Sequence, residues 1–164
     1  MKHLFTALLM VAGSLMSFAQ DSAKVTKVID GDTFEVYYKG QKIRCRLGNV
    51  DAPEKDQFYG SIAADSLSNW VLGKVCRITY KKKDLYGRQL VALSYKGINA
   101  DEWLVYNGWA WHYEKYSTNK AKLNTLQANA QAKKRGLWVC EYNVPPQTWR
   151  TFNKRNKLLY EKCK

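Results

Sequence analysis

Acidic residues are scarce in this sequence, which has 14 Asp+Glu against 27 Lys+Arg in 164 residues. The formal charge of +13 at pH 7 predicts a polyanionic partner, either nucleic acid, an anionic membrane surface or an acidic polysaccharide. Charge alone does not choose among these partners, and a solubilising basic surface is the simpler alternative. Acids that stand close together in so basic a chain, such as Asp51 and Glu54, therefore need a specific explanation.

The sequence also has no C-x-x-C pair, which argues against a zinc site. Its four cysteines are an even number, and in an exported chain an even number favours disulfide bonds. Cys45 and Cys76 fall on the apolar faces of expected strands, while Cys140 and Cys163 bracket the C-terminal tail. We predict the pairs Cys45–Cys76 and Cys140–Cys163. The alternative for the first pair is two packed thiols.

A long apolar run occurs at the N-terminus, from Leu4 to Leu15, after a positively charged start. Small residues follow at Ser17 and Ala19, so the pattern predicts a signal peptide over residues 1–19, cut before Gln20. A membrane anchor is the alternative, but the run is short against the ~20 residues that span a bilayer. We therefore expect an exported protein, periplasmic or secreted, that is monomeric and keeps no stable membrane association.

The apolar pattern predicts an α+β fold with a helix between the third and fourth strands and two helices after the fifth. This order favours a five-stranded Greek-key barrel of the oligonucleotide-binding (OB) type with about three helices, although a small α+β sandwich gives a similar order. We expect one domain over residues 20–140 and a basic extension over 141–164, clipped to it by a disulfide. The expected strands are 24–29, 33–38, 43–47, 75–80 and 89–95, and the expected helices are 61–72, 99–106 and 119–135.

Four short motifs occur in the order and approximate spacing of the thermonuclease (staphylococcal nuclease-like) family, and the chain resembles that family over roughly residues 24–139. The resemblance implies an OB-type barrel that acts on DNA and RNA with Ca²⁺. The motifs are Val28–Thr33 (VIDGDT), Arg46–Glu54 (RLGNVDAPE), Asp84–Arg88 (DLYGR) and Gly136–Trp138 (GLW).

The resemblance places metal ligands at Asp32, Asp51 and the carbonyl of Ala52. This agrees with the preference of Ca²⁺ for carboxylate, carbonyl and water oxygens. The alternative for Asp32 is a turn aspartate that bonds its own backbone. Ala52 stands where some family members have Thr, so any hydroxyl contact is lost while the carbonyl remains.

Catalytic roles fall on Glu54, Arg46 and Arg88. A glutamate beside a metal-bound phosphate can orient and deprotonate water, and planar guanidinium groups can hold two phosphoryl oxygens at once. The resemblance places both arginines on catalytic positions. The alternative for Glu54 is a glutamate that stabilises the start of a helix.

Three tyrosines, Tyr86, Tyr113 and Tyr116, are candidates for stacking on a nucleotide base. Core or shell packing is an equal alternative for the aromatic cluster around Tyr113. Leu85 stands where a family member can carry Lys beside the substrate, so one phosphate contact is absent.

These residues and the family resemblance together imply a Ca²⁺-dependent endonuclease that cleaves DNA and RNA with low sequence specificity. The resemblance further implies cleavage that leaves a 3′-phosphate. The alternative from another class is a non-catalytic nucleic-acid-binding module on the same barrel. A protein that binds acidic polysaccharide or membranes would explain the charge but not the acids.

Overall fold

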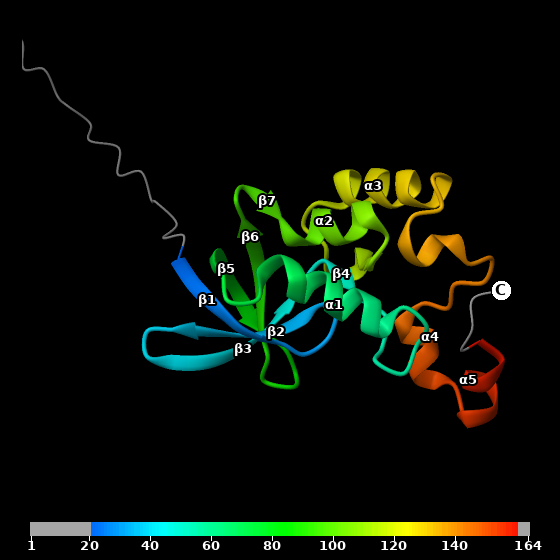
Figure 1. Cartoon of the computed structure of the whole chain (residues 1–164), viewed down its shortest axis with the longest axis horizontal. Coiled ribbons are helices and arrows are strands. Elements are labelled where there is room, and N and C mark those ends of the chain that lie inside the picture. The colour runs from blue at the N-terminus through cyan, green and yellow to red at the C-terminus, as the bar shows by residue number, and fades with distance from the viewer. Residues whose placement is uncertain (1–20, 161–164) are drawn as a thin grey trace, which may run out of the picture.

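The computed structural model describes residues 21–160, except the side chain of Tyr116. The expected signal peptide and Cys163 lie outside the described residues. Within them, no helix is long and apolar enough to cross a membrane. The fold combines a barrel with five α-helices, arranged as in Figure 1.

Five strands form the barrel, and they follow one another around it in the order β3-β2-β1-β5-β6. A parallel pairing of β3 with β6 closes the ring, and the other pairings within it are antiparallel. This closed α+β architecture confirms the predicted OB-type barrel and not the sandwich. The strands are β1 (Asp21–Val28), β2 (Thr33–Tyr38), β3 (Gln41–Leu47), β5 (Val75–Lys83) and β6 (Gln89–Tyr95).

The β2–β3 hairpin illustrates how local sequence sets the register. Lys39 and Gly40 have positive φ angles of 47° and 81°, a conformation typical of two-residue turns whose twist matches that of antiparallel strands. The register that follows places Arg46 opposite Thr33, beside the turn between β1 and β2. Because strand side chains alternate between faces, the buried Cys45 and Leu47 on either side of Arg46 direct it away from the core.

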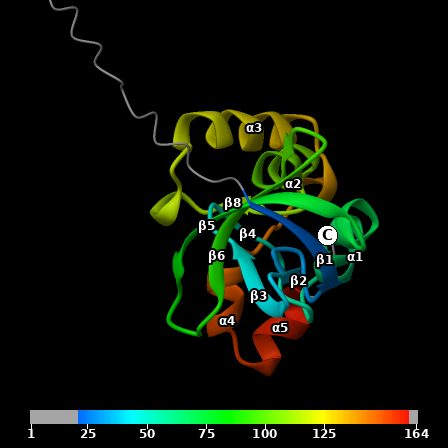
Figure 2. The same ribbon diagram turned by 90° about the vertical axis from the view of Figure 1, so that its left-hand side faces the viewer.

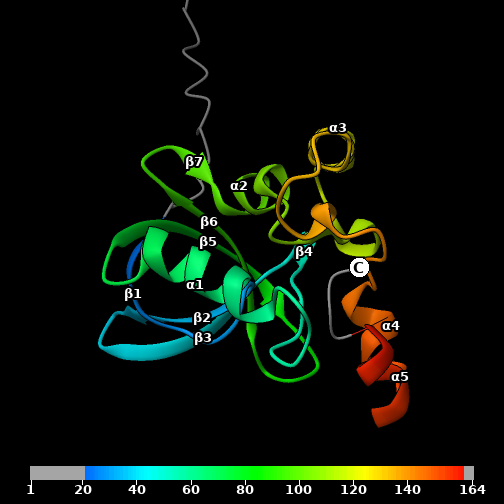
Figure 3. The same ribbon diagram turned by 45° about the vertical axis from the view of Figure 1, so that its right-hand side comes forward.

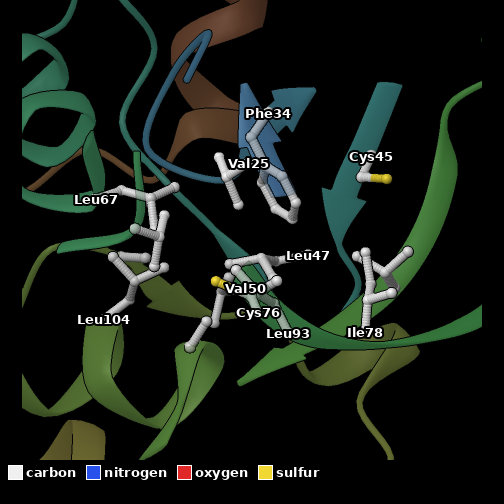
Figure 4. Packing of buried hydrophobic residues seen from close by; sticks show 14 of the residues in the cluster. Val25, Phe34, Cys45, Leu47, Val50, Leu67, Cys76, Ile78, Leu93 and Leu104 are labelled. Atoms are coloured by element: carbon white, nitrogen blue, oxygen red, sulfur yellow. The ribbon is translucent and has the colours of Figure 1, made fainter. Parts of the chain in front are cut away.

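The core fills the barrel and continues under the helices. Figure 4 shows Val25 and Phe34 from the first hairpin near Leu67 of the first helix and Leu104 of the second. All four side chains are fully buried. One apolar cluster therefore holds the barrel and the helices together.

The predicted Cys45–Cys76 disulfide is wrong, because both residues are buried free thiols. Cys45 lies opposite Gln89, the first residue of β6, whereas Cys76 precedes Arg77, which lies opposite Ser94 near the end of β6. Most of the length of β6 separates the two cysteines, and a disulfide needs Cα atoms within about 7 Å. Figure 4 shows them at separate places in the core. Cys140 is not a free thiol, and its pairing with Cys163 stays a prediction.

Three helices follow the predicted order. Asn99 caps the second of them by accepting a hydrogen bond from the Glu102 backbone N–H at 3.1 Å, as a good N-cap residue does. The third helix ends three residues earlier than predicted, because Lys134 adopts a positive φ of 49° and the chain turns there. These helices are α1 (Gly60–Val71), α2 (Ala100–Asn107) and α3 (Lys120–Ala132).

Short elements join the barrel to the helices. A two-stranded sheet pairs the strand that contains Asp51 with the segment that contains His112, so the Trp-rich region after α2 lies beside the acidic motif. These elements are β4 (Val50–Asp51), β7 (Ile98–Asn99), β8 (Trp111–His112) and the 3₁₀ helices η1 (Glu114–Tyr116) and η2 (Gly136–Val139).

The C-terminal segment, residues 141–160, forms two short helices that the sequence did not predict. They are α4 (Pro146–Thr151) and α5 (Lys154–Tyr160), with Pro146 at the first position of α4, where its missing N–H costs no helical hydrogen bond. Figure 2 shows α4 and α5 on the opposite side of the barrel from α3. Trp149 is fully buried, so this segment is packed onto the domain.

Candidate active site

Two turns meet at the end of the barrel, and their contact brings Asp32 and Asp51 together. A Cβ atom on Gly31 would lie only 2.7 Å from the Cβ of Ala52 and 2.8 Å from the Cβ of Ala63. Glycine therefore permits this close approach of the two turns. The Ala52 backbone N–H donates to Asp32 Oδ2 at 2.9 Å, which fixes the two turns in register.

Arg46 joins the two carboxylates. Its Nη1 lies 2.6 Å from Asp32 Oδ1 and its Nη2 lies 2.6 Å from Asp51 Oδ1. Burial alone would lower the pKa of Arg46, but the charges of Asp32 and Asp51 raise it above its ordinary value. Burial raises the pKa of Asp32, while the charge of Arg46 counteracts this. The arrangement is a buried ionic cluster of two carboxylates and one guanidinium, whose members depend on one another.

Asp51 has one carboxylate oxygen that is fully engaged and one that is not. Oδ1 accepts from Arg46 and also from Arg150 Nη2 at 3.0 Å. Oδ2 is buried and has no hydrogen-bond partner among the described residues. An unpartnered buried anionic oxygen is costly, and a cation bound at Oδ2 would relieve that cost.

Glu54 lies at the rim of the same cluster, two residues after Ala52, with its side chain 34% exposed. Its backbone N–H donates to Gln57 Oε1 at 3.1 Å. Its carboxylate Oε1 accepts from Arg150 Nη2 at 2.6 Å and from Arg150 Nε at 2.7 Å. The glutamate is therefore presented to solvent and held by a guanidinium at the same time.

Arg88 approaches from the loop between β5 and β6. Asp84 holds it through a 2.7 Å bond to the guanidinium Nε and through a bond to the backbone N–H. Burial alone would raise the pKa of Asp84, but the bonds from Arg88 and from the Tyr86 backbone N–H lower it below its ordinary value. Arg88 thus faces the cavity with its orientation set by its own loop.

All these groups line one open cavity of about 780 Å³. It contains every residue predicted for catalysis and metal binding. Several exposed basic side chains are part of its lining, which suits an anionic ligand. The lining includes Asp32, Arg44, Arg46, Asp51, Ala52, Glu54, Lys82, Lys83, Tyr86, Arg88, Tyr113 and Arg150.

Two of the three predicted base-stacking tyrosines reach this cavity. Tyr86 is 84% exposed, and the Arg88 guanidinium lies 5.5 Å from its ring centroid. Tyr113 is half-buried and its backbone N–H donates to the Asn49 carbonyl. The side chain of Tyr116 lies outside the described residues. Leu85 is fully exposed and lines the cavity, so position 85 offers no charged group to a phosphate.

Arg150 is the site residue that sequence reasoning missed. It comes from α4, which lies beside the loop that follows β4 (Figure 3). Burial alone would lower the pKa of Arg150, but the carboxylates of Asp51 and Glu54 raise it above its ordinary value. The basic tail and its single tryptophan were visible in the sequence, but no local pattern links position 150 to position 54.

Comparison with known proteins now identifies the fold family. Residues 44–140 match the profile of a family described as "Staphylococcal nuclease homologue". The chain belongs to this family. An "uncharacterized endonuclease" of Escherichia coli O157:H7 is 43% identical over 128 residues, covering 77% of this chain and 83% of its own.

Two further relatives match nearly the whole chain. An "uncharacterized endonuclease" of Haemophilus influenzae is 38% identical over 158 residues, covering 94% of this chain and 88% of its own. A "micrococcal nuclease" of Shigella flexneri is 31% identical over 170 residues, covering 94% of this chain and 98% of its own. The family resemblance drawn from the four motifs is confirmed.

Proposed function

We propose that this protein is an exported, Ca²⁺-dependent endonuclease that hydrolyses phosphodiester bonds of DNA and RNA with low sequence specificity. The observation that carries the proposal is the convergence of Asp32, Asp51, Arg46 and Glu54 in one basic cavity. Paired carboxylates, a guanidinium and a separate glutamate are the groups that metal-assisted phosphodiester hydrolysis uses. Family membership and the nuclease names of the relatives support the same reaction class.

The oxygen atoms of the cavity fit a hard divalent cation. Asp51 Oδ2 is a buried carboxylate oxygen that lacks a partner, which a cation would supply. In residues 21–160, no three His, Cys, Asp or Glu side chains form a group that could hold a metal ion. Asp32 and Asp51 would therefore be joined by the Ala52 carbonyl and by water, which Ca²⁺ accepts as ligands. The bound ion would supply positive charge to the phosphoryl oxygens.

Arg46 and Arg88 would bind the phosphoryl oxygens from two sides of the cavity. Guanidinium groups form charge-assisted bonds that strengthen as negative charge accumulates during attack on phosphorus. Arg46 is oriented by the two aspartates and Arg88 by Asp84. Both are therefore pre-organised before a substrate arrives.

Glu54 would accept a proton from the attacking water. The water oxygen forms a bond to phosphorus while the bond from phosphorus to the 5′-oxygen breaks. The 5′-oxygen takes a proton from solvent water and leaves as a hydroxyl group, and the other product carries a 3′-phosphate. The partial exposure of Glu54 gives water access to the carboxylate. Tyr86 and Tyr113 would bound the adjacent base, and stacking on an aromatic face carries little sequence preference.

Digestion of plasmid DNA and of RNA by the mature protein tests this function. We expect cleavage with Ca²⁺, no cleavage with a chelator, and a large loss of rate in Glu54→Gln. Binding of DNA without Ca²⁺-dependent cleavage would instead indicate a non-catalytic nucleic-acid-binding module. Full activity of Glu54→Gln would refute the role of Glu54 as the base and leave the nuclease function standing.

Export is tested separately, because it depends on residues 1–19 and not on the cavity. We expect a protein produced in a bacterium with a periplasm to be recovered from that compartment with Gln20 at its N-terminus. Recovery from the cytoplasm with residues 1–19 intact would refute it. Gel filtration tests the expected monomer.

A further inference from the structure

We infer that Arg150 is a positioning residue of the active site, which holds the Glu54 carboxylate in place, and that the C-terminal segment is thereby part of the site. This inference rests on the proposed nuclease function. It concerns a residue that lies beyond the part of the chain matched by the family profile, which ends at residue 140.

The C-terminal segment is anchored firmly enough to hold a side chain at a fixed place. The indole N–H of Trp149 donates to Asp56 Oδ1 at 2.9 Å, and Lys157 Nζ lies 2.7 Å from the other oxygen of Asp56. The Gln57 side-chain amide donates to the Val144 carbonyl. All three contacts attach the segment to residues 56 and 57, which lie two and three positions after Glu54. Arg150 follows the buried Trp149 in the chain, so its backbone is fixed beside that loop.

Arg150 is bound to the acids of the site by several short contacts. Its Nε and Nη2 both lie within 2.7 Å of Glu54 Oε1, and its Nη2 also lies 3.0 Å from Asp51 Oδ1. The ionic side chains therefore form a continuous row of alternating charge, which runs Asp32, Arg46, Asp51, Arg150, Glu54. Arg150 links the proposed base to the proposed metal ligands.

Two features favour positioning of Glu54 over direct binding of substrate phosphate. First, the guanidinium already points two donor groups at one carboxylate oxygen, which restricts the rotation of the Glu54 side chain and hence the positions open to Oε2. Second, Glu54 is partly exposed, and a solvated glutamate otherwise samples several rotamers at an entropic cost to any one of them. Loss of about 1 Å in the placement of a reacting group can cost on the order of 100-fold in rate.

The test compares Arg150→Gln and Arg150→Lys with Arg155→Gln, an exposed arginine of α5 that does not line the cavity. We expect kcat for DNA cleavage to fall about 10- to 100-fold in Arg150→Gln, with KM nearly unchanged. The kcat of Arg150→Lys should fall by less, because lysine keeps the charge but not the two-donor geometry. Arg155→Gln should cleave as the wild type does.

A double-mutant cycle decides whether Arg150 acts through Glu54. In a Glu54→Gln background, Arg150→Gln should cause little further loss of kcat, since the group it positions is already absent. An undiminished further loss would overturn the inference. So would an unchanged kcat with a raised KM, the result expected of a phosphate-binding residue, or a raised kcat, the result expected of a restraint on the base.

Measurements without turnover complete the test. DNA affinity in the presence of a chelator should be equal in Arg150→Gln and Arg155→Gln, and a selective loss in the former would overturn positioning. If Arg150→Gln lowers the unfolding midpoint, its loss of kcat could come from lost stability, and Arg150→Lys then serves as the test. A lower kcat in Arg150→Lys, with an unfolding midpoint equal to that of the wild type, supports the inference. An unchanged kcat in Arg150→Lys overturns it. Absence of Ca²⁺-dependent cleavage by the wild type would instead refute the proposed function itself.

Discussion

Gly31 and Ala52 approach each other so closely that no side chain fits between them, and this contact sets the spacing of the two aspartates that flank it. A Cβ on Gly31 would meet the Ala52 and Ala63 Cβ atoms at 2.7 and 2.8 Å. The neighbouring Asp32 is bonded to the Ala52 N–H across the same contact. The spacing of the two proposed metal ligands thus depends on the absence of a side chain at Gly31.

Gly31→Ala should therefore impair both stability and cleavage. Inserting a methyl group where atoms are in contact typically costs about 1–3 kcal/mol, and the displaced turn would move Asp32 away from Asp51. Chemical denaturation and plasmid cleavage measure the two effects. Gly48→Ala is the control for stability, because its Cβ would meet only Lys81 Nζ at 3.9 Å. Equal stability of the two variants would contradict this packing argument.

Asp51→Asn should abolish stabilisation by Ca²⁺. A ligand present at 100 times its dissociation constant stabilises the folded state by about 2.7 kcal/mol, so Ca²⁺ should raise the unfolding midpoint of the wild type and a chelator should reverse the rise. The variant should show no rise, since Asp51 supplies the unpartnered buried oxygen. Asp65→Asn, on the exposed face of α1, should respond as the wild type does. A normal Ca²⁺ response in Asp51→Asn would place the metal elsewhere.

Asp101 should make stability fall as pH rises through the weakly acidic range. Burial raises the pKa of Asp101 from 3.8 to about 6, although a 2.6 Å bond from Asn49 opposes this. Because the folded state binds the proton more tightly, the ionised carboxylate penalises folding above about pH 6, and this penalty is relieved as pH falls toward about 4.

Asp101→Asn should remove that dependence. Relative to the wild type, its free energy of unfolding should rise by about 2–3 kcal/mol between about pH 4 and about pH 7.5. Urea denaturation at both pH values measures the change. Parallel pH profiles of variant and wild type would contradict the assignment.

The two thiols of the barrel should be unreactive in the native protein. Burial raises the pKa of Cys45 to about 12 and that of Cys76 to about 11, and reaction with alkylating reagents requires an accessible thiolate. We expect both to be alkylated only after denaturation, without prior reduction. Non-reducing peptide mapping that found either in a disulfide would contradict the structure. The same map tests the predicted Cys140–Cys163 bond.

The order of strands and helices favoured the barrel, and the family resemblance, together with local patterns, pointed to most residues of the cavity. Alternation along β3 turns Arg46 outward, and the motif at 51–54 carries two acids that a tight turn presents together. Alternation along a strand indicates which face a side chain lies on, but not how far along the barrel axis it lies. The predicted pairing of Cys45 with Cys76 was wrong for this reason. Nor could α4 and Arg150 be predicted, since a six-residue helix has too little periodicity and its docking depends on contacts across the whole chain.

The position of Arg150 also changes where the functional unit ends. The family profile stops at residue 140, but the wall of the cavity is completed ten residues later. A protein shortened at that boundary would keep its barrel and its paired aspartates, yet Glu54 would lose its ionic partner and Asp56 would lose the Trp149 indole. Exchange of this segment between relatives is consequently a route to altering turnover without touching the barrel.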